Sequence, residues 1–284
     1  MKNIEGGINC EVNIDTGANK ANEGDSGKEQ QRGEGWETEK KEGMKDIKGL
    51  VFGNSLFERN GQSQMIADIA ASLDDKFSLN MLAPDNSHLQ WHGTDKATFE
   101  LIKSNPGDIM ILQERGEDMA RGGKYADEYI LPYAKRIIKS YRQINPEGRI
   151  ILFQTWAGKN GEADIEAPEV GSYSEMQVRI NKAYEAMARE LKAQGIDTEI
   201  APVGEAWNWV RNNYFDIELY TDNMKDPYKY VHPSRAGSYL SACVFYATIF
   251  GKSVIKASGL DIDSSQALIL REAADKFALH RQNK

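Results

Sequence analysis

A serine early in the chain, together with a histidine and a nearby aspartate late in the chain, supplies the residue types that nucleophilic catalysis needs. Ser55 ends the turn Gly-Asn-Ser at 53–55, and His232 lies near the other end of the chain. Catalysis by a hydroxyl needs a base within hydrogen-bond reach and a group that orients the base. An aspartate upstream of the histidine, Asp222 or Asp226, can serve as that group. The alternative interpretation of Gly-Asn-Ser is an ordinary strand-to-helix turn with Ser55 as its cap.

The elements that must hold these residues alternate between strands and helices. Short apolar runs predict strands over 49–52, 77–82, 108–113, 149–154 and 198–203. Periodic apolar positions predict helices over 62–73, 94–104, 125–144, 172–195, 205–212, 233–250 and 265–280. This alternation predicts an α/β fold with a parallel sheet covered by helices on both faces. Ligands of such sheets bind at the carboxyl ends of the strands, where Ser55 is expected.

The first 45 residues differ in composition from the rest of the 284-residue chain. They are rich in glycine, glutamate, lysine, asparagine and aspartate, and apolar residues are sparse. Such a segment cannot bury enough apolar surface to offset the entropy lost on ordering. We therefore expect a disordered polar tail over 1–45 and one globular domain over 46–284. Of the two cysteines, Cys10 falls in the tail, and Cys243 is expected to be a small core residue.

Charge and hydropathy exclude several classes of partner. The formal net charge of −8 argues against a nucleic acid or an anionic membrane surface. No run of eighteen apolar residues predicts a transmembrane helix. The N-terminus lacks the apolar segment of a signal peptide, which predicts a cytoplasmic protein, or a secreted one if a leader precedes this sequence. The turn at 53–55 is not a phosphate-binding loop. His88 and His92 lack a third ligand, so no metal site is predicted.

Motifs at both ends of the domain resemble those of the GDSL/SGNH hydrolase superfamily. The resemblance is closest to a bacterial branch that carries Gly-Asn-Ser in place of Gly-Asp-Ser. It rests on Gly53-Asn54-Ser55-Leu56, Leu219-Tyr220-Thr221-Asp222 and 232–240 (HPSRAGSYL), with support from 112–114 (LQE), 153–157 (FQTWA) and 201–207 (APVGEAW). It covers about residues 48–252. It implies a flavodoxin-like three-layer α/β/α sandwich with a five-stranded parallel sheet, and serine ester hydrolysis without a cofactor.

By position, the resemblance implies that Ser55 is the nucleophile and His232 the general base. Members of this superfamily typically carry an aspartate three residues before the histidine, and this chain has Lys229 there. An insertion over 223–231 would account for the difference. We therefore prefer Asp222 as the residue that orients His232 and keep Asp226 as the alternative.

Three groups are candidate donors to the oxyanion of an ester's tetrahedral intermediate. The first is the backbone N–H of Ser55. The superfamily supplies the others from a glycine after the second strand and an asparagine after the third, where this chain has Asn86 and Gln113. Gln113 could instead be a polar strand end that bonds a neighbouring loop, and Asn86 could be an ordinary turn residue.

Four further residues are candidates for binding the substrate: Asn54, Trp91, His92 and Trp156. Trp91 could stack on the face of a sugar, and His92 matches a histidine of the branch motif. Trp156 follows the fourth predicted strand. Both tryptophans are equally well explained as packing residues.

These observations predict a serine esterase that removes an acyl group, such as acetate, from a carbohydrate or another small ester through an acyl-enzyme. The alternative is a catalytically impaired protein of the same fold that binds carbohydrate. The displaced acid and the absence of the glycine after the second strand favour that alternative.

Overall fold

The computed structural model describes residues 43–161 and 170–282. Their sheet has five strands, all parallel, in the order β2-β1-β3-β4-β5. The strands are β1 (Asp46–Phe52), β2 (Lys76–Leu82), β3 (Ile109–Leu112), β4 (Arg149–Phe153) and β5 (Glu199–Ala201). All five predicted strands are present, and the predicted three-layer α/β/α fold is confirmed.

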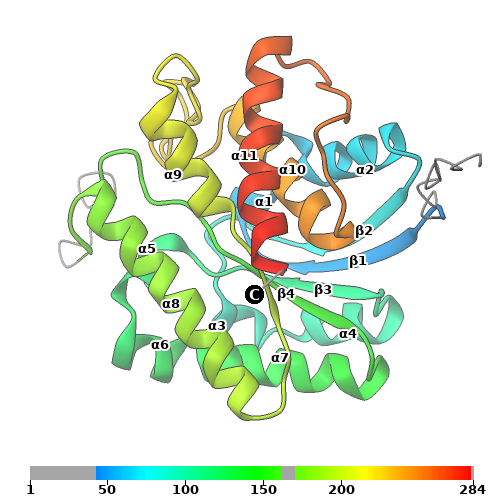
Figure 1. Cartoon of the computed structure of the whole chain (residues 1–284). Helices are drawn as coiled ribbons and strands as arrows, with labels where there is room; N and C mark the ends of the chain where they lie inside the picture. The colour runs from blue at the N-terminus through cyan, green and yellow to red at the C-terminus, as the bar shows by residue number, and fades with distance from the viewer. Residues whose placement is uncertain (1–42, 162–169, 283–284) are drawn as a thin grey trace, which may run out of the picture. The chain divides into compact units, whose positions relative to one another are not determined.

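Helices cover both faces of the sheet (Figure 1). The longer helices are α2 (Gln62–Ser72), α4 (Lys96–Ser104), α7 (Leu131–Ile144), α8 (Tyr173–Ala193), α9 (Val203–Asn213), α10 (Arg235–Phe250) and α11 (Ser264–Gln282). The shorter ones are α1 (Ser55–Glu58), the 3₁₀ helix η1 (Arg59–Gly61), α3 (Leu89–His92), α5 (Gly116–Arg121) and α6 (Gly123–Tyr129). Within the described ranges, none of these helices combines the length and apolar character needed to cross a membrane.

The core lies in two layers because successive strand residues point to opposite faces of the sheet. Val51 packs with α2, α9, α10 and α11 on one face, whereas Leu50 and Phe52 pack with α4, α7 and α8 on the other. Cys243 is fully buried in α10, as the sequence predicts.

The helix predicted over 125–144 is two helices. They meet at Ile130, whose backbone angles (φ −115°, ψ −61°) leave the regular helical range. Pro132 lies in the first turn of α7, where its missing N–H costs nothing; further inside a helix it would break a hydrogen bond. The apolar periodicity continues across the junction, so only the proline marked it.

The folded unit that contains the sheet begins at Gly43. Lys45, which the sequence analysis placed in the polar tail, donates its backbone N–H to Asp75 Oδ1 at 2.9 Å and its Nζ to Phe250 O at 3.0 Å. Lys45 therefore belongs to the folded domain. Residues 1–42 of the predicted tail, with Cys10, lie outside the described residues.

Candidate active site

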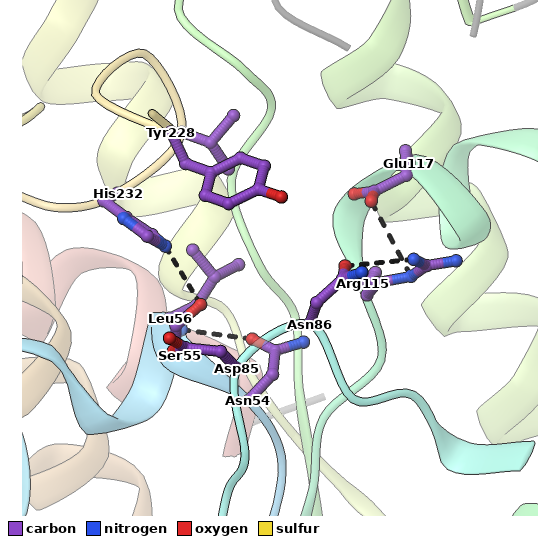
Figure 2. A pocket seen from close by; sticks show the side chains of 10 residues that line it. Asn54, Ser55, Leu56, Asp85, Asn86, Arg115, Glu117, Tyr228 and His232 are labelled. Atoms are coloured by element: carbon purple, nitrogen blue, oxygen red, sulfur yellow. Dashed lines mark hydrogen bonds and ion pairs between the residues drawn. The ribbon is translucent and has the colours of Figure 1, made fainter. Parts of the chain in front are cut away.

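A pocket of about 70 Å³ lies at the carboxyl ends of β1, β2 and β3 (Figure 2). Each of these strands is followed by a turn that contributes to the wall, and the loop between α9 and α10 closes the pocket. Its lining residues are Asn54, Ser55, Leu56, Asp85, Asn86, Arg115, Glu117, Tyr228, Val231 and His232. The pocket therefore brings together the Gly-Asn-Ser motif near the start of the domain and the motif that begins at His232.

Ser55 is the first residue of α1, directly after the turn that follows β1. The turn is tight: a Cβ on Gly53 would lie 2.5 Å from the Oε1 atom of Gln113. Asn54 caps α1 because its Oδ1 accepts a hydrogen bond from the backbone N–H of Leu56 at 3.1 Å. Ser55 thus serves as the first helical residue, and the cap that the alternative interpretation assigned to it is Asn54.

His232 lies between the serine and a carboxylate. Its Nε2 is 3.0 Å from Ser55 Oγ, and its Nδ1 is 2.7 Å from Asp226 Oδ2. An ionised carboxylate can only accept, so Nδ1 carries a proton and Nε2 of the neutral ring accepts the proton of the serine hydroxyl. His232 is only 3% exposed. Serine, histidine and aspartate therefore lie in the order that hydroxyl activation requires.

Asp226 contacts His232, so the preference for Asp222 is wrong. Asp226 Oδ1 accepts the backbone N–H of Tyr228 at 2.8 Å, a local turn that directs Oδ2 at the imidazole. Asp222 is exposed on the same loop. Burial by itself would raise the pKa of Asp226, but hydrogen bonds from His232 and Tyr228 and the charge of Arg59 hold it below its usual value.

The backbone around His232 is fixed from several sides. The His232 N–H donates to Tyr228 O at 2.8 Å, and its carbonyl accepts from Thr221 N at 3.0 Å. Trp156 Nε1 donates to Val231 O at 2.8 Å. These bonds hold the imidazole at the pocket through a loop that otherwise has no regular structure.

Gln113 is not placed as an oxyanion donor. It is fully buried, its Nε2 donates to Asn54 Oδ1 at 2.6 Å, and its Oε1 accepts from Asn54 N at 3.1 Å. Both ends of the amide therefore bond Asn54 in the turn before Ser55. This agrees with the alternative interpretation of Gln113 as a polar strand end that bonds a neighbouring loop. Glu114 does not orient Gln113; its carboxylate accepts from the backbone N–H groups of Leu89 and Arg115.

Asn86 lines the pocket in the conformation that glycine most readily adopts. Its φ is +58°, in the left-handed region that asparagine tolerates better than most residues. Its Oδ1 accepts from Arg115 Nη1 at 3.0 Å. Among the described residues, neither its backbone N–H nor its Nδ2 donates a hydrogen bond, so both can serve a ligand.

Two of the substrate-binding candidates, Trp156 and His92, are buried and do not face the pocket. Trp156 is 1% exposed and stacks on Trp207 with ring centres 4.0 Å apart, so it is a packing residue. His92 is fully buried, and its Nε2 donates to Gly53 O at 2.8 Å. Burial lowers the pKa of His92 to about 4, so the ring is neutral.

The other two candidates, Asn54 and Trp91, do not offer a polar group to a ligand. The Nδ2 of Asn54 donates to Ser87 O at 3.0 Å, and its Oδ1 accepts from both Leu56 and Gln113. Trp91 is half-buried and packs its ring against His92, outside the residues that line the pocket.

His88 caps α3 through its Nδ1, and His92 points instead to Gly53. No group of three or more histidine, cysteine or acidic side chains suited to a metal ion occurs in the part of the chain that the structure describes.

The sequence did not identify six residues of the pocket wall as site candidates: Leu56, Asp85, Arg115, Glu117, Tyr228 and Val231. One signal was available, because Arg115 and Glu117 follow a buried strand at the edge where ligands bind. Tyr228 had no such signal, since its place depends on the course of the loop before His232.

Comparisons with solved structures identify the fold. No family model and no curated protein matches this chain. A DUF4886 family protein from Bacteroides uniformis ATCC 8492 is similar at a TM-score of 0.65 and 16% identity, over 84% of this chain and 96% of the other. A protein described as a candidate SGNH hydrolase from Slackia heliotrinireducens has a TM-score of 0.53 and 23% identity, over 72% and 99%.

A third similar structure is a family 3 carbohydrate esterase from Clostridium thermocellum, with a TM-score of 0.50 and 12% identity, over 72% of this chain and 96% of the other. At such low identities these similarities concern the fold alone. They show that the chain shares the α/β/α fold of proteins that include SGNH hydrolases.

Proposed function

We propose that the protein is a serine ester hydrolase that works through an acyl-enzyme. The observation that carries this proposal is the line of contacts from Ser55 Oγ to His232 Nε2 (3.0 Å) and from His232 Nδ1 to Asp226 Oδ2 (2.7 Å), at the wall of a pocket. This is the inventory and the order of a hydroxyl nucleophile, its base and the group that orients the base.

The reaction follows from these contacts. As Ser55 Oγ attacks the ester carbonyl carbon, His232 Nε2 takes the hydroxyl proton, and Asp226 stabilises the resulting imidazolium. The tetrahedral intermediate collapses when His232 returns that proton to the leaving alcohol, and Ser55 is left acylated. Water then attacks the acyl-enzyme with His232 again as base, which releases the carboxylic acid and restores the serine.

The oxyanion of each tetrahedral intermediate needs hydrogen-bond donors. The Ser55 N–H is the first of α1 and has no partner within the helix. Asn86, which lines the same pocket, has a backbone N–H and an amide Nδ2. We propose these as the donors, in place of Gln113.

For the substrate, we propose a short acyl group such as acetate on a carbohydrate. The small volume of the pocket, about 70 Å³, supports a short acyl chain. Tyr228 offers a half-exposed aromatic ring at the pocket, and Asp85 and Glu117 offer carboxylates that can accept hydrogen bonds from sugar hydroxyls. The family 3 carbohydrate esterase among the similar structures supports the same choice.

The alternative function is a protein of the same fold that binds carbohydrate without hydrolysing it. Two sequence features favour it: the absence of an aspartate three residues before His232 and the absence of a glycine after the second strand. In the structure Asp226 contacts His232 although it is not the residue three before the histidine, and Asn86 has a φ of +58°, in the left-handed region that glycine readily adopts. Both observations support the hydrolase.

The test is hydrolysis of p-nitrophenyl acetate by the wild type, Ser55→Ala and the control Ser63→Ala, which changes a serine on α2 outside the pocket. A fluorophosphonate probe, located by mass spectrometry, should label Ser55 in the wild type and the control. Activity and label should both be lost in Ser55→Ala alone. Undiminished hydrolysis by Ser55→Ala would reject the proposal. Release of acetate from acetylated sugars, compared with p-nitrophenyl esters of increasing chain length, then tests the substrate.

A further inference from the structure

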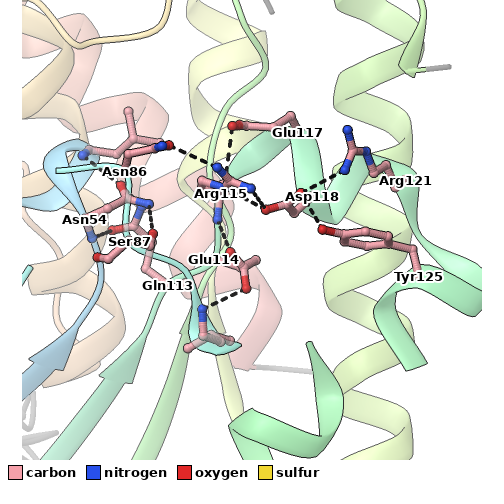
Figure 3. A network of polar contacts seen from close by, with 12 residues as sticks. Asn54, Asn86, Ser87, Gln113, Glu114, Arg115, Glu117, Asp118, Arg121 and Tyr125 are labelled. Atoms are coloured by element: carbon pink, nitrogen blue, oxygen red, sulfur yellow. Dashed lines mark hydrogen bonds and ion pairs between the residues drawn. The ribbon is translucent and has the colours of Figure 1, made fainter. Parts of the chain in front are cut away.

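Arg115 connects the pocket wall to a buried acidic residue (Figure 3). Its guanidinium donates from Nε to Asp118 Oδ2 at 2.6 Å and places Nη2 2.5 Å from the same oxygen. From its other side, Nη1 donates to Asn86 Oδ1 at 3.0 Å. One planar group thus bonds both to a side chain inside the protein and to a side chain at the pocket.

The inner end of this connection is held rigidly. Asp118 is 2% exposed, and its Oδ1 accepts from Tyr125 Oη at 2.9 Å and from Arg121 Nη1 at 3.4 Å. Burial by itself would lower the pKa of Arg115, but the charges of Asp118 and Glu117 raise it, so the guanidinium is charged. A charged, planar group with several bonds to a buried carboxylate has little freedom to turn.

The outer end determines how the Asn86 amide is oriented. A guanidinium has donors and no acceptor, so the Asn86 atom that faces it must be Oδ1. Nδ2 is then the end left for the pocket. Without Arg115, the exposed amide could rotate or turn its oxygen toward an oxyanion, which would repel the developing charge. Preorganised donors stabilise an oxyanion because they need no reorientation during the reaction.

Arg115 is poorly suited to bind an anionic substrate directly. Two carboxylates surround it, since Glu117 Oε1 lies 3.6 Å from Nε in addition to the Asp118 contact. Asp118 and Glu117 therefore already pair the charge of Arg115. A role in holding Asn86 therefore explains the arginine better than a role in attracting an anion.

We infer that Arg115 is a positioning residue that, anchored by Asp118, orients the Asn86 amide so that its Nδ2 donates to the oxyanion. This inference rests on the proposed hydrolase. Arg115, in the turn after β3, would thus hold in place a donor, Asn86, that lies in the turn after β2.

A double-mutant cycle in p-nitrophenyl acetate hydrolysis tests the inference. Asn86→Ala should lower kcat about a hundred-fold, the effect of losing one oxyanion donor. Arg115→Lys keeps the charge beside Asp118 but cannot reach both partners, and should lower kcat about tenfold with KM within twofold. In the Asn86→Ala background, Arg115→Lys should have no further effect. Independent, multiplying effects, or a rise in KM alone, would overturn the inference.

The matched control is Arg121→Met, which removes the other arginine on Asp118 and leaves the Arg115–Asn86 contact in place. Its kcat should stay within twofold of the wild type at a temperature at which all variants are folded. A loss equal to that of Arg115→Lys would overturn the inference, because it would trace the effect to Asp118 and not to the Asn86 contact.

A second measurement does not depend on turnover. In protein labelled with ¹⁵N-asparagine, the side-chain NH₂ signals of Asn86 are assigned by their absence in Asn86→Asp. They should shift or broaden in Arg115→Lys and Arg115→Met and stay in place in Arg121→Met. Unchanged signals in both Arg115 variants would overturn the positioning role. If the wild type hydrolyses no ester, the proposed function fails, and these signals still decide whether Arg115 orients Asn86.

Discussion

Replacement of Asp226 by asparagine should lower kcat for ester hydrolysis about a hundred- to a thousand-fold. Asp226 Oδ2 lies 2.7 Å from His232 Nδ1, and the ring becomes positively charged when it takes the serine proton. Two unit charges about 4 Å apart at an effective dielectric constant of about 20 interact by about 4 kcal/mol. One factor of ten in rate corresponds to about 1.4 kcal/mol, so this equals about a thousand-fold. The Asp226 side chain is 11% exposed, and screening by solvent sets the lower figure.

The assay is the steady-state hydrolysis of p-nitrophenyl acetate, with kcat and KM determined separately. Asparagine preserves the shape of the side chain and an oxygen for the Tyr228 N–H, so KM should change little. The matched control is Asp222→Asn, an exposed residue on the same loop, which should stay within twofold of the wild type. A loss of less than threefold in Asp226→Asn, or an equal loss in Asp222→Asn, would refute the assignment of the orienting acid.

The wild type and Asp226→Asn should also differ in stability, by an amount that depends on pH. The pKa of Asp226 in the folded protein lies below its value in the unfolded chain, about 3.9. Its contribution is therefore fully present above that unfolded value and is lost as the pH falls through the lower folded value. The difference in unfolding free energy between wild type and Asp226→Asn should be constant above about pH 5 and shrink below about pH 4. A difference that stays constant from about pH 5 down to about pH 2 would contradict the lowered pKa.

Three further predictions concern residues around the pocket. The folded His92 pKa of about 4 lies below its unfolded value, so the wild type should lose about 3 kcal/mol of unfolding free energy through this residue between pH 6.5 and pH 4. His92→Gln keeps an N–H for Gly53 O, and its urea unfolding should lack that loss. Trp156→Phe should lower the unfolding free energy by about 1–2 kcal/mol through loss of its hydrogen bond, and a changed KM with unchanged stability would show a role in binding instead. Tyr228→Ala should raise KM for acetylated sugars about tenfold, whereas Tyr230→Ala, an exposed tyrosine that does not line the pocket, should not; equal effects would argue against a sugar-stacking ring at 228.

Local patterns in the sequence predicted most of the fold. The five strands are short apolar runs, and α8 begins within one residue of the start predicted for it, at a capping box of Ser172 and Glu175. These signals are local because periodic burial and capping depend on residues within one or two turns of the chain. The short helices α1, α3 and α5 were not predicted, since a stretch of four to six residues is too short to show periodicity.

By itself the sequence also determined the candidate nucleophile and base. Ser55 follows the first strand, and His232 directly precedes the last pair of helices, so the fold brings both to the carboxyl edge of the sheet. Topology alone brings such positions together, and the structure places the two side chains 3.0 Å apart across 177 residues of sequence.

Only the tertiary structure decided which polar groups complete the site. Asp226 contacts His232 because a turn in the loop directs its carboxylate inward, and Asp222 stays outside. Gln113 is occupied by Asn54, so the amide left at the pocket is that of Asn86. Hydrogen bonds between side chains depend on differences of a few ångströms in backbone path. Residue type and spacing do not specify such differences, because several neighbouring polar residues satisfy the same local pattern.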